Sequence, residues 1–296
     1  MLIFGILLGL VALALLISYI CYRIAFYAPP RKPLPEGTIE IPEGEIYEVY
    51  REKMENWVRQ MWKLPHQSFE ITSFDGLTLH GKFYEYAPGA PVELMFHGYR
   101  GNADRDLCGG VQRCFALGRS ALVVDQRAAG ESDGHVITMG ICERRDCLSW
   151  IDFTIEHFGP DVKIILTGIS MGAATVLMAA GLELPPTVRG IIADCGFTSG
   201  WDEISYLIRK AHVPCGGLVL RAADLFAKKI AGFSFRECST VESLQNCDLP
   251  VLLIHGREDD FVPPQFSAEN YSACRGKKEL HIVPGAKHGT SYMVDL

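Results

Sequence analysis

The chain opens on a continuous apolar run, since residues 2–22 carry no charged side chain. A helix of this length, rising about 1.5 Å per residue, spans the roughly 30 Å hydrocarbon core of a bilayer. We therefore expect a membrane anchor over residues 1–27, with a cleaved signal peptide or a buried core helix as the alternatives. A signal peptide would require a Lys or Arg before the apolar run, and this chain has none there. Arg23, Arg31 and Lys32 follow it, which predicts a single-pass protein with the remainder of the chain in the cytoplasm.

Residues 28–66 form a second segment, predicted to hold a linker and an amphipathic helix. The prolines between residues 28 and 44 extend the chain and cannot bury a core. From residue 47 to residue 62, apolar side chains recur every three or four positions, which predicts a helix with one apolar face. This face either packs on the domain that follows or lies on the membrane surface beside the anchor. The linker prolines are Pro29, Pro30, Pro33, Pro35 and Pro42.

Short apolar runs alternate with helix-length segments from residue 67 to residue 296. Two β-rich runs flank Asp75-Gly76 and predict a hairpin. The later runs are compact and separated by helical stretches, which predicts an α/β fold: a doubly wound, mostly parallel eight-stranded sheet covered on both faces. An apolar insert over about residues 199–246 is longer than one crossover helix and predicts a small helical lid. The expected strands are 69–73, 77–84, 92–96, 121–125, 163–167, 190–193, 251–254 and 279–283.

Composition and charge exclude several classes of protein. The chain is 48% apolar and 21% charged, so it can bury a large core and is not disordered. Its net charge of −7 offers no basic surface for a polyanion, and we expect no nucleic-acid partner. The ten cysteines show no C-x-x-C pair and no metal-ligand spacing, which favours reduced thiols in a reducing compartment.

The candidate chemistry starts at Gly168-Ile169-Ser170-Met171-Gly172, which lies between an expected strand and an expected helix. Glycines on both sides of a serine permit a sharp strand-to-helix turn that exposes the hydroxyl at the edge of the sheet. A serine hydroxyl is a weak nucleophile, and it needs a base together with a group that orients that base. Ser170 is therefore the candidate nucleophile.

In this arrangement the acid and then the histidine should follow later in the chain, each on a loop after a strand. The loop after the strand at 279–283 contains His288, our candidate general base. The loop after the strand at 251–254 contains Glu258, Asp259 and Asp260. Asp259 is the preferred orienting acid, and its two acidic neighbours remain alternatives.

Negative charge that develops on an attacked carbonyl oxygen needs fixed hydrogen-bond donors. The residue after the nucleophile supplies one amide, which here is Met171. The loop 97–102, directly after the strand at 92–96, should supply the second amide, and Tyr99 is the preferred donor. Arg100 in this loop either binds a substrate carboxylate or is an ordinary surface residue. Asp125 and Arg127 are expected to shape the scaffold.

These motifs, in this order, resemble an α/β-hydrolase of the bacterial serine-aminopeptidase-like type, some members of which carry an N-terminal membrane anchor. The quoted motifs are Asp75-Gly76-Leu77, His97-Gly98-Tyr99, the stretch from Asp125 to Ser132, Gly168 to Gly172, the loop 255–263 and His288-Gly289. The resemblance implies a triad of Ser170, Asp259 and His288, with oxyanion-hole donors at Tyr99 and Met171. One departure is visible: relatives usually have Arg-Gly-x-Gly where this chain has Arg127-Ala128-Ala129-Gly130.

Together these features predict a serine hydrolase that cleaves an ester, thioester or amide through an acyl-enzyme, with no metal or organic cofactor. Esters are preferred, because no acidic cluster that would hold the free amine of a peptide substrate can be located in the sequence. Lipid-like acyl substrates fit an apolar lid beside a membrane anchor. The alternatives are a serine aminopeptidase-like peptidase and a noncatalytic protein of this fold that binds a lipid or a protein partner. The oligomeric state is not predicted.

Overall fold

The protein is built around one eight-stranded sheet, which the computed structural model shows with residues 2–29, 35 and 37–295 described. The strand order is β1-β2-β4-β3-β5-β6-β7-β8. The first two strands pair antiparallel, β2 also pairs antiparallel with β4, and all later pairs are parallel. The predicted fold is thereby confirmed. The strands are β1 Gln67–Thr72, β2 Thr78–Tyr84, β3 Val92–Phe96, β4 Ser120–Val124, β5 Ile164–Ile169, β6 Val188–Asp194, β7 Val251–Gly256 and β8 Lys278–Val283.

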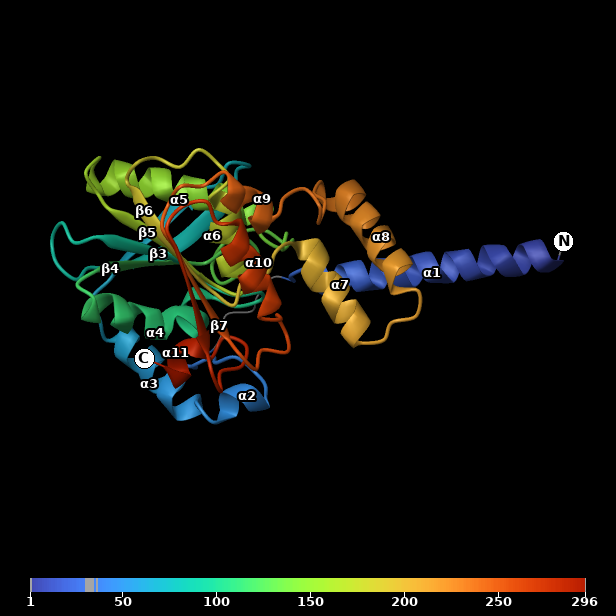
Figure 1. The fold of residues 1–296 in the computed structure, drawn as a ribbon, viewed down its shortest axis with the longest axis horizontal. Helices are drawn as coiled ribbons and strands as arrows, with labels where there is room; N and C mark the ends of the chain where they lie inside the picture. Colours follow the sequence, from blue (N-terminus) through green and yellow to red (C-terminus); the bar gives the residue numbers. More distant parts are fainter. Residues whose placement is uncertain (1, 30–34, 36, 296) are drawn as a thin grey trace.

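Helices cover both faces of the sheet, as the view in Figure 1 shows. Every residue of β3 and β4 is buried, because these central strands contact helices on either side. One face carries α5 and α6, and the opposite face carries α3 and α4. The helices of the main body are α4 Ala103–Ala116, α5 Glu143–Phe158, α6 Met171–Ala179, α9 Thr240–Gln245, α10 Gln265–Ala273 and α11 Ser291–Val294.

The segment before the sheet is more ordered than the expected linker and single helix. It forms a short helix, α2 Glu45–Glu48, and then α3 Arg51–Trp62. The buried face of α3, with Val58 and Met61, packs against α4, so this face covers the domain. The expected helix is divided in two at Val49 and Tyr50. Of the predicted linker prolines, Pro30 and Pro33 lie outside the described residues.

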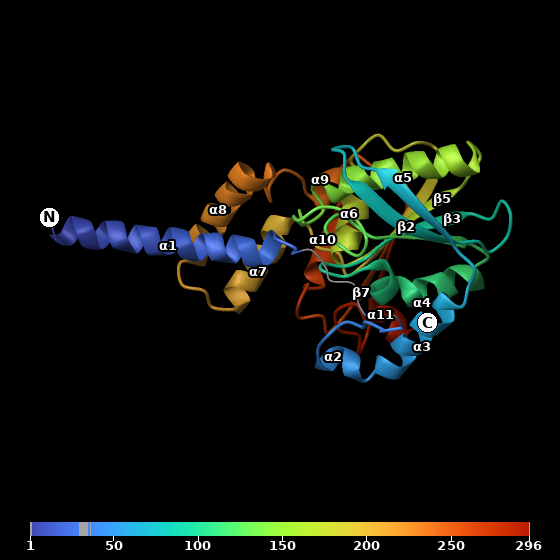
Figure 2. The same ribbon diagram turned by 180° about the vertical axis from the view of Figure 1, so that it is seen from behind.

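The lid insert folds as α7 Gly200–Lys210, α8 Gly216–Phe226 and a π-helical turn, η1 Ala227–Ala231. It lies against the N-terminal helix α1 Leu2–Phe26, which projects away from the body in Figures 1 and 2. The end of α1 is buried there, and Phe26 stacks on Phe235 with ring centroids 4.6 Å apart.

Within the described residues, no helix combines the length and the apolar character that crossing a membrane requires.

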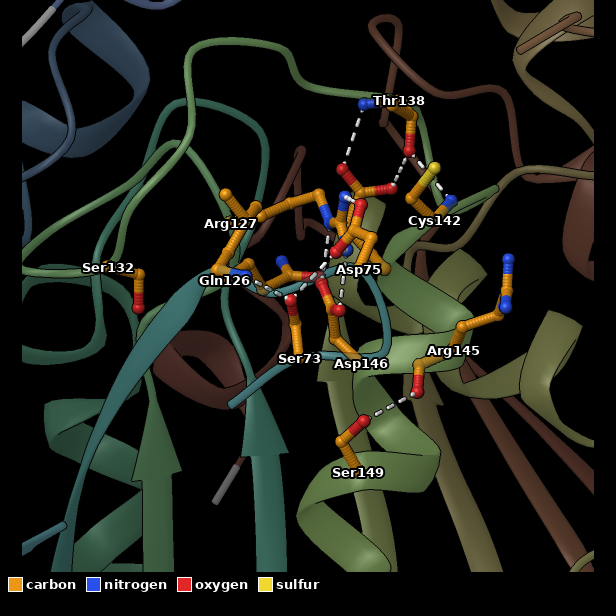
Figure 3. A network of polar contacts seen from close by, with 12 residues as sticks. Ser73, Asp75, Gln126, Arg127, Ser132, Thr138, Cys142, Arg145, Asp146 and Ser149 are labelled. Atoms are coloured by element: carbon orange, nitrogen blue, oxygen red, sulfur yellow. Dashed lines mark hydrogen bonds and ion pairs between the residues drawn. The ribbon is translucent and has the colours of Figure 1, made fainter. Parts of the chain in front are cut away.

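An ion-pair network centred on the buried Arg127 joins the hairpin turn, the turn after β4 and α5 (Figure 3). The Arg127 guanidinium donates through Nε to Asp146 in α5 at 2.6 Å, and through Nη1 to Asp75 in the hairpin turn at 2.9 Å. Asp125 accepts a hydrogen bond from the Ala103 amide at 2.8 Å, which fixes the start of α4. Because buried charges are stable only when paired, these contacts account for the structural role expected of Asp125 and Arg127.

The departure from Arg-Gly-x-Gly leaves a strained turn after β4. Ala128 has a φ of +60°, in the left-handed region that glycine adopts easily and other residues adopt at a cost. Gly130, two residues later, has a φ of +54°. The turn therefore keeps a conformation suited to glycine although alanine stands at its first position.

Candidate active site

Ser170 lies in a tight turn between β5 and α6. Its φ of +56° and ψ of −117° are strained for a residue with a side chain, as in a nucleophile elbow. A Cβ added to Gly168 would lie 2.1 Å from the carbonyl oxygen of Gly172, and one added to Gly172 would lie 2.1 Å from that of Phe96. Both glycines are required because backbone fills the space that a side chain would need.

The structure brings Ser170, His288 and Asp259 into one line of hydrogen bonds. The Nε2 atom of His288 lies 3.0 Å from the Ser170 hydroxyl oxygen, although 118 positions separate the two residues. The Nδ1 atom of His288 lies 2.7 Å from Oδ2 of Asp259. With the proton on Nδ1, the imidazole donates to the carboxylate and accepts from the hydroxyl. This is the arrangement in which an imidazole removes a proton from serine.

Asp259 is held as a buried carboxylate, whereas its neighbour Asp260 is exposed. Oδ1 of Asp259 accepts hydrogen bonds from the amides of Phe261 and Val262, each at 2.9 Å. Burial raises the pKa of Asp259, but hydrogen bonds from His255 and His288 outweigh burial and lower it to about 2. Asp259 is therefore ionised at neutral pH and faces the imidazole, while Asp260 points toward the lid.

His255 supports this acid, a role that the sequence interpretation did not assign. It is the last residue but one of β7 and is fully buried. Its Nδ1 lies 2.6 Å from the Ser267 hydroxyl, and its Nε2 lies 2.9 Å from the Val262 carbonyl oxygen and 3.3 Å from Oδ2 of Asp259. The available signal was a histidine at a strand end, four positions before the acid. His255 therefore fixes both ends of the loop that carries Asp259.

The loop after β3 lies directly beside the nucleophile. A Cβ added to Gly98 would be 3.5 Å from the Ser170 Cβ, which leaves no room for a larger residue. The Gly98 amide donates to Oδ2 of Asp106 at 3.0 Å, so the next amide, that of Tyr99, is the candidate donor to substrate. Met171 begins α6, where the first amides have no acceptor within the helix. Both predicted donors thus belong to segments that border Ser170.

In the structure Arg100 contacts the end of α1, a position that neither of its two expected roles had predicted. Its guanidinium donates to the carbonyl oxygens of Ile24 at 2.7 Å and Tyr27 at 2.9 Å. Cations at the carboxyl end of a helix stabilise its exposed carbonyls. Arg100 therefore caps the end of α1 and joins that helix to the loop after β3.

A cleft of about 850 Å³ opens over the triad, and residues 39–48 form one of its walls. This wall comes from the end of the predicted linker and the start of the predicted helix, and it brings Glu43 and Glu45 to the cleft. Asp260 adds a further carboxylate at the rim. The Tyr47 hydroxyl lies 3.6 Å from the position of a Cβ on Gly289, next to His288. Carboxylates outnumber the two arginines of the cleft, Arg51 and Arg105, so the cleft is acidic on balance, a property that the sequence alone did not reveal.

The lid is attached to the loop that carries the triad acid. The Tyr206 hydroxyl donates to the Asp260 carbonyl oxygen at 3.1 Å, and Lys210 pairs with the Asp260 carboxylate at 2.9 Å. On the same helix, Glu203 is 2% exposed, and its carboxylate oxygens have no hydrogen-bond partner among the described residues. Burial, together with the charge of Asp259, raises the pKa of Glu203 to about 8.

Comparison with known proteins agrees with the observed fold. Residues 92–213 match the family described as alpha/beta hydrolase fold. The esterase Pf2001 of Pyrococcus furiosus has a similar structure, with a TM-score of 0.64 and 18% identity, covering 90% of this chain and 92% of the esterase. The chain therefore has the α/β-hydrolase fold, and residues 92–213 are similar to the family of that description.

Two sequence relatives extend the comparison. The Bacillus subtilis protein YqkD is 31% identical over 176 residues, which cover 60% of this chain and 58% of YqkD. The Schizosaccharomyces pombe protein bem46 is 25% identical over 246 residues, which cover 79% of this chain and 74% of bem46. The match to YqkD thus spans less than two thirds of that relative.

Proposed function

We propose that the protein is a serine hydrolase that cleaves a carboxylic ester, or a thioester or amide, through an acyl-enzyme on Ser170. The observation that carries this proposal is the hydrogen-bonded line from Asp259 through His288 to Ser170. The strained turn at Ser170 adds support, since such strain is a feature of nucleophile elbows. The similarity to a structure named as an esterase agrees with the proposal.

In the proposed reaction, Nε2 of His288 takes the hydroxyl proton as Ser170 attacks the carbonyl carbon. Asp259 holds the imidazole in the correct tautomer and stabilises the imidazolium that forms. The amides of Tyr99 and Met171 donate to the oxyanion. His288 then passes its proton to the leaving group, and water activated by the same imidazole releases the acid and restores Ser170.

A fluorophosphonate probe tests the nucleophile, because its phosphorus is attacked only by an activated serine. We expect the wild type to be labelled and the Ser170→Ala variant to remain unlabelled. Ser120→Ala, which alters a buried serine at the start of β4 and away from the triad, is the matched control and should label like the wild type. A wild-type protein that is folded but unlabelled would favour the noncatalytic alternative, a protein of this fold that binds a lipid or a protein partner.

A second candidate, a peptidase of the serine-aminopeptidase type, is favoured by one observation. Glu43, Glu45 and Asp260 line the cleft, and carboxylates attract the ammonium group of a substrate with a free amine. Rates over p-nitrophenyl esters of increasing chain length and over aminoacyl p-nitroanilides separate the two candidates. Faster cleavage of the plain esters supports the esterase, whereas a preference for free-amine substrates that Glu43→Gln weakens supports the peptidase.

We further propose that the protein associates with a membrane through α1 and the lid, and that its hydrolase domain faces the cytoplasm. Apolar side chains are exposed along α1, and Leu218, Leu225 and Ile230 are exposed on the lid beside it. Lys228 and Lys229 lie in η1, where they would meet anionic headgroups. A lipid-like ester would then reach the cleft from the bilayer.

Flotation with vesicles of phosphatidylcholine and phosphatidylglycerol tests this association. We expect wild-type protein to float with the vesicles and the Leu218→Asp/Leu225→Asp double variant to float less. Equal flotation of both proteins would show that the lid surface plays no part. A reporter fused after Leu296 tests the orientation, since activity of an exported reporter would contradict the cytoplasmic assignment.

A further inference from the structure

A buried thiol lies beside the triad and takes no part in the proposed reaction. Cys195 directly follows β6 and is fully buried, with a φ of +48°. Its sulfur, a carboxylate oxygen of Asp259 and a ring nitrogen of His288 all lie within 4.8 Å of one another. The cysteine is separated by more than sixty positions from the other two residues, so only the fold assembles this group.

These three groups are the ligands that zinc prefers. Thiolate sulfur binds Zn²⁺ at about 2.3 Å, and imidazole nitrogen and carboxylate oxygen bind it at about 2.0–2.2 Å. Ligand atoms at these distances in a tetrahedron lie about 3.5 Å apart, and the three atoms here lie within 4.8 Å of one another, which is close to that spacing. Because Asp259 already contacts Nδ1 of His288, an ion bound to this carboxylate takes Nδ1 as its nitrogen ligand.

The surroundings favour a cation at this position. The acidic cleft with Glu43, Glu45 and Asp260 leads to His288, whose side chain is 12% exposed. Clefts lined by one sign of charge concentrate ions of the opposite sign. The cleft therefore concentrates cations next to His288, the ligand of the three that lines it.

We propose that Cys195, Asp259 and His288 form an inhibitory site for a thiophilic divalent cation such as Zn²⁺. Binding forms a zinc–sulfur bond and releases the thiol proton to solvent. It also occupies Nδ1 of His288, so the ring proton moves to Nε2, the atom that faces Ser170. The imidazole then donates to the hydroxyl and has no free electron pair with which to remove its proton. Three protein ligands leave the fourth position of the ion for water.

Cobalt binding tests the site without reference to catalysis. Co²⁺ ligated by a thiolate gives an ultraviolet charge-transfer band, which we expect when Co²⁺ is added to reduced wild-type protein. The band should disappear on addition of Zn²⁺ and should be absent from Cys195→Ser and from the second variant, Cys195→Ala. Cys247→Ala, which removes a buried thiol in the main core, should keep it. No band in folded wild-type protein would overturn the proposal, whatever the variants show.

Inhibition rests on the proposed serine hydrolase function and is measured separately. In the presence of a chelator, wild type, Cys195→Ser and Cys247→Ala should all react with the fluorophosphonate probe. Excess Zn²⁺ should slow labelling of wild type and Cys247→Ala at least tenfold, and that of Cys195→Ser much less. Equal sensitivity of Cys195→Ser and wild type would overturn the proposal. No labelling of wild type in chelator would instead contradict the proposed function, while the cobalt band would still decide the site.

Discussion

The Tyr99 hydroxyl donates a 2.7 Å hydrogen bond to the backbone carbonyl oxygen of Ala25, in the last turn of α1. Arg100 reinforces this contact, because its Nε donates to the same hydroxyl at 2.8 Å. The N-terminal helix is thus fixed to the loop that we propose supplies an oxyanion-hole amide. A change at the end of α1 should therefore alter kcat.

Removal of the Tyr99 hydroxyl tests this connection. A hydrogen bond of this type contributes about 1 kcal/mol, so Tyr99→Phe should lower kcat by up to about fivefold if the bond holds the amide in place. Steady-state kinetics on a p-nitrophenyl ester measure the effect. Tyr86→Phe is the control, since Tyr86 is half exposed. Unchanged kcat in Tyr99→Phe would show that the loop keeps its position without α1.

The adjacent acids Asp259 and Asp260 offer a matched pair of variants. Asp259→Asn should lower kcat about 10³- to 10⁴-fold, because an amide at this position favours the wrong imidazole tautomer. Asp260→Asn should change kcat only a few-fold, since its carboxylate pairs with Lys210 of the lid. Single-turnover labelling compares the two variants. A greater loss of activity in Asp260→Asn than in Asp259→Asn would show that Asp259 is not the triad acid.

Glu203 should make stability depend on pH. Its pKa rises from the ordinary 4.5 to about 8 on folding, so its contribution to stability is complete below about pH 4.5 and is lost as the pH rises through 8. Glu203→Gln should melt close to the wild type at pH 5 and at a higher temperature at pH 9. The gain can reach a few kcal/mol, with about 5 kcal/mol as the upper limit for such a shift.

Thermal unfolding at the two pH values measures this gain. Glu269→Gln is the control, since this residue is exposed and its substitution should not alter the pH dependence. If Glu203→Gln lost stability equally at pH 5 and pH 9, the buried carboxyl would not be the source of the pH dependence.

Ala128 and Ala129 separate the effect of backbone strain from that of a lost methyl group. Ala128→Gly should raise the free energy of unfolding by up to about 1 kcal/mol, because relief of the left-handed strain exceeds the added entropy of the unfolded chain. Ala129 is buried and has no positive φ, so Ala129→Gly should lower stability. Denaturant titration measures both variants. A loss of stability in Ala128→Gly would contradict the strain argument.

The sheet and the triad were predictable because each depends on local patterns. The run at Val92–Phe96 is apolar at every position except Glu93. The strand was therefore predicted at its observed bounds. Ser170, Asp259 and His288 each follow a strand, and the carboxyl ends of parallel strands meet at one edge of the sheet. Their proximity follows from topology rather than from their separation along the chain.

Other parts of the site were hidden because they depend on distant contacts. Residues 39–48 contain one proline and four glutamates, and most of them precede the predicted helix, so their sequence is typical of a linker. Their position against the cleft depends on how α3 packs on α4, which no local pattern encodes. The same holds for Arg100, whose carbonyl partners lie more than seventy positions earlier. His255 was missed because its partners are set by the folding of the loop after it.

The wall formed by residues 39–48 lies outside the region 92–213 that matches the family. A wall of this kind can diverge without disturbing the nucleophile elbow or the sheet, because it contributes to neither. Homologues with the same triad can therefore differ in the molecules they accept through this short segment alone. Exchanging residues 39–48 between two such homologues would transfer their selectivity while leaving each catalytic apparatus in place.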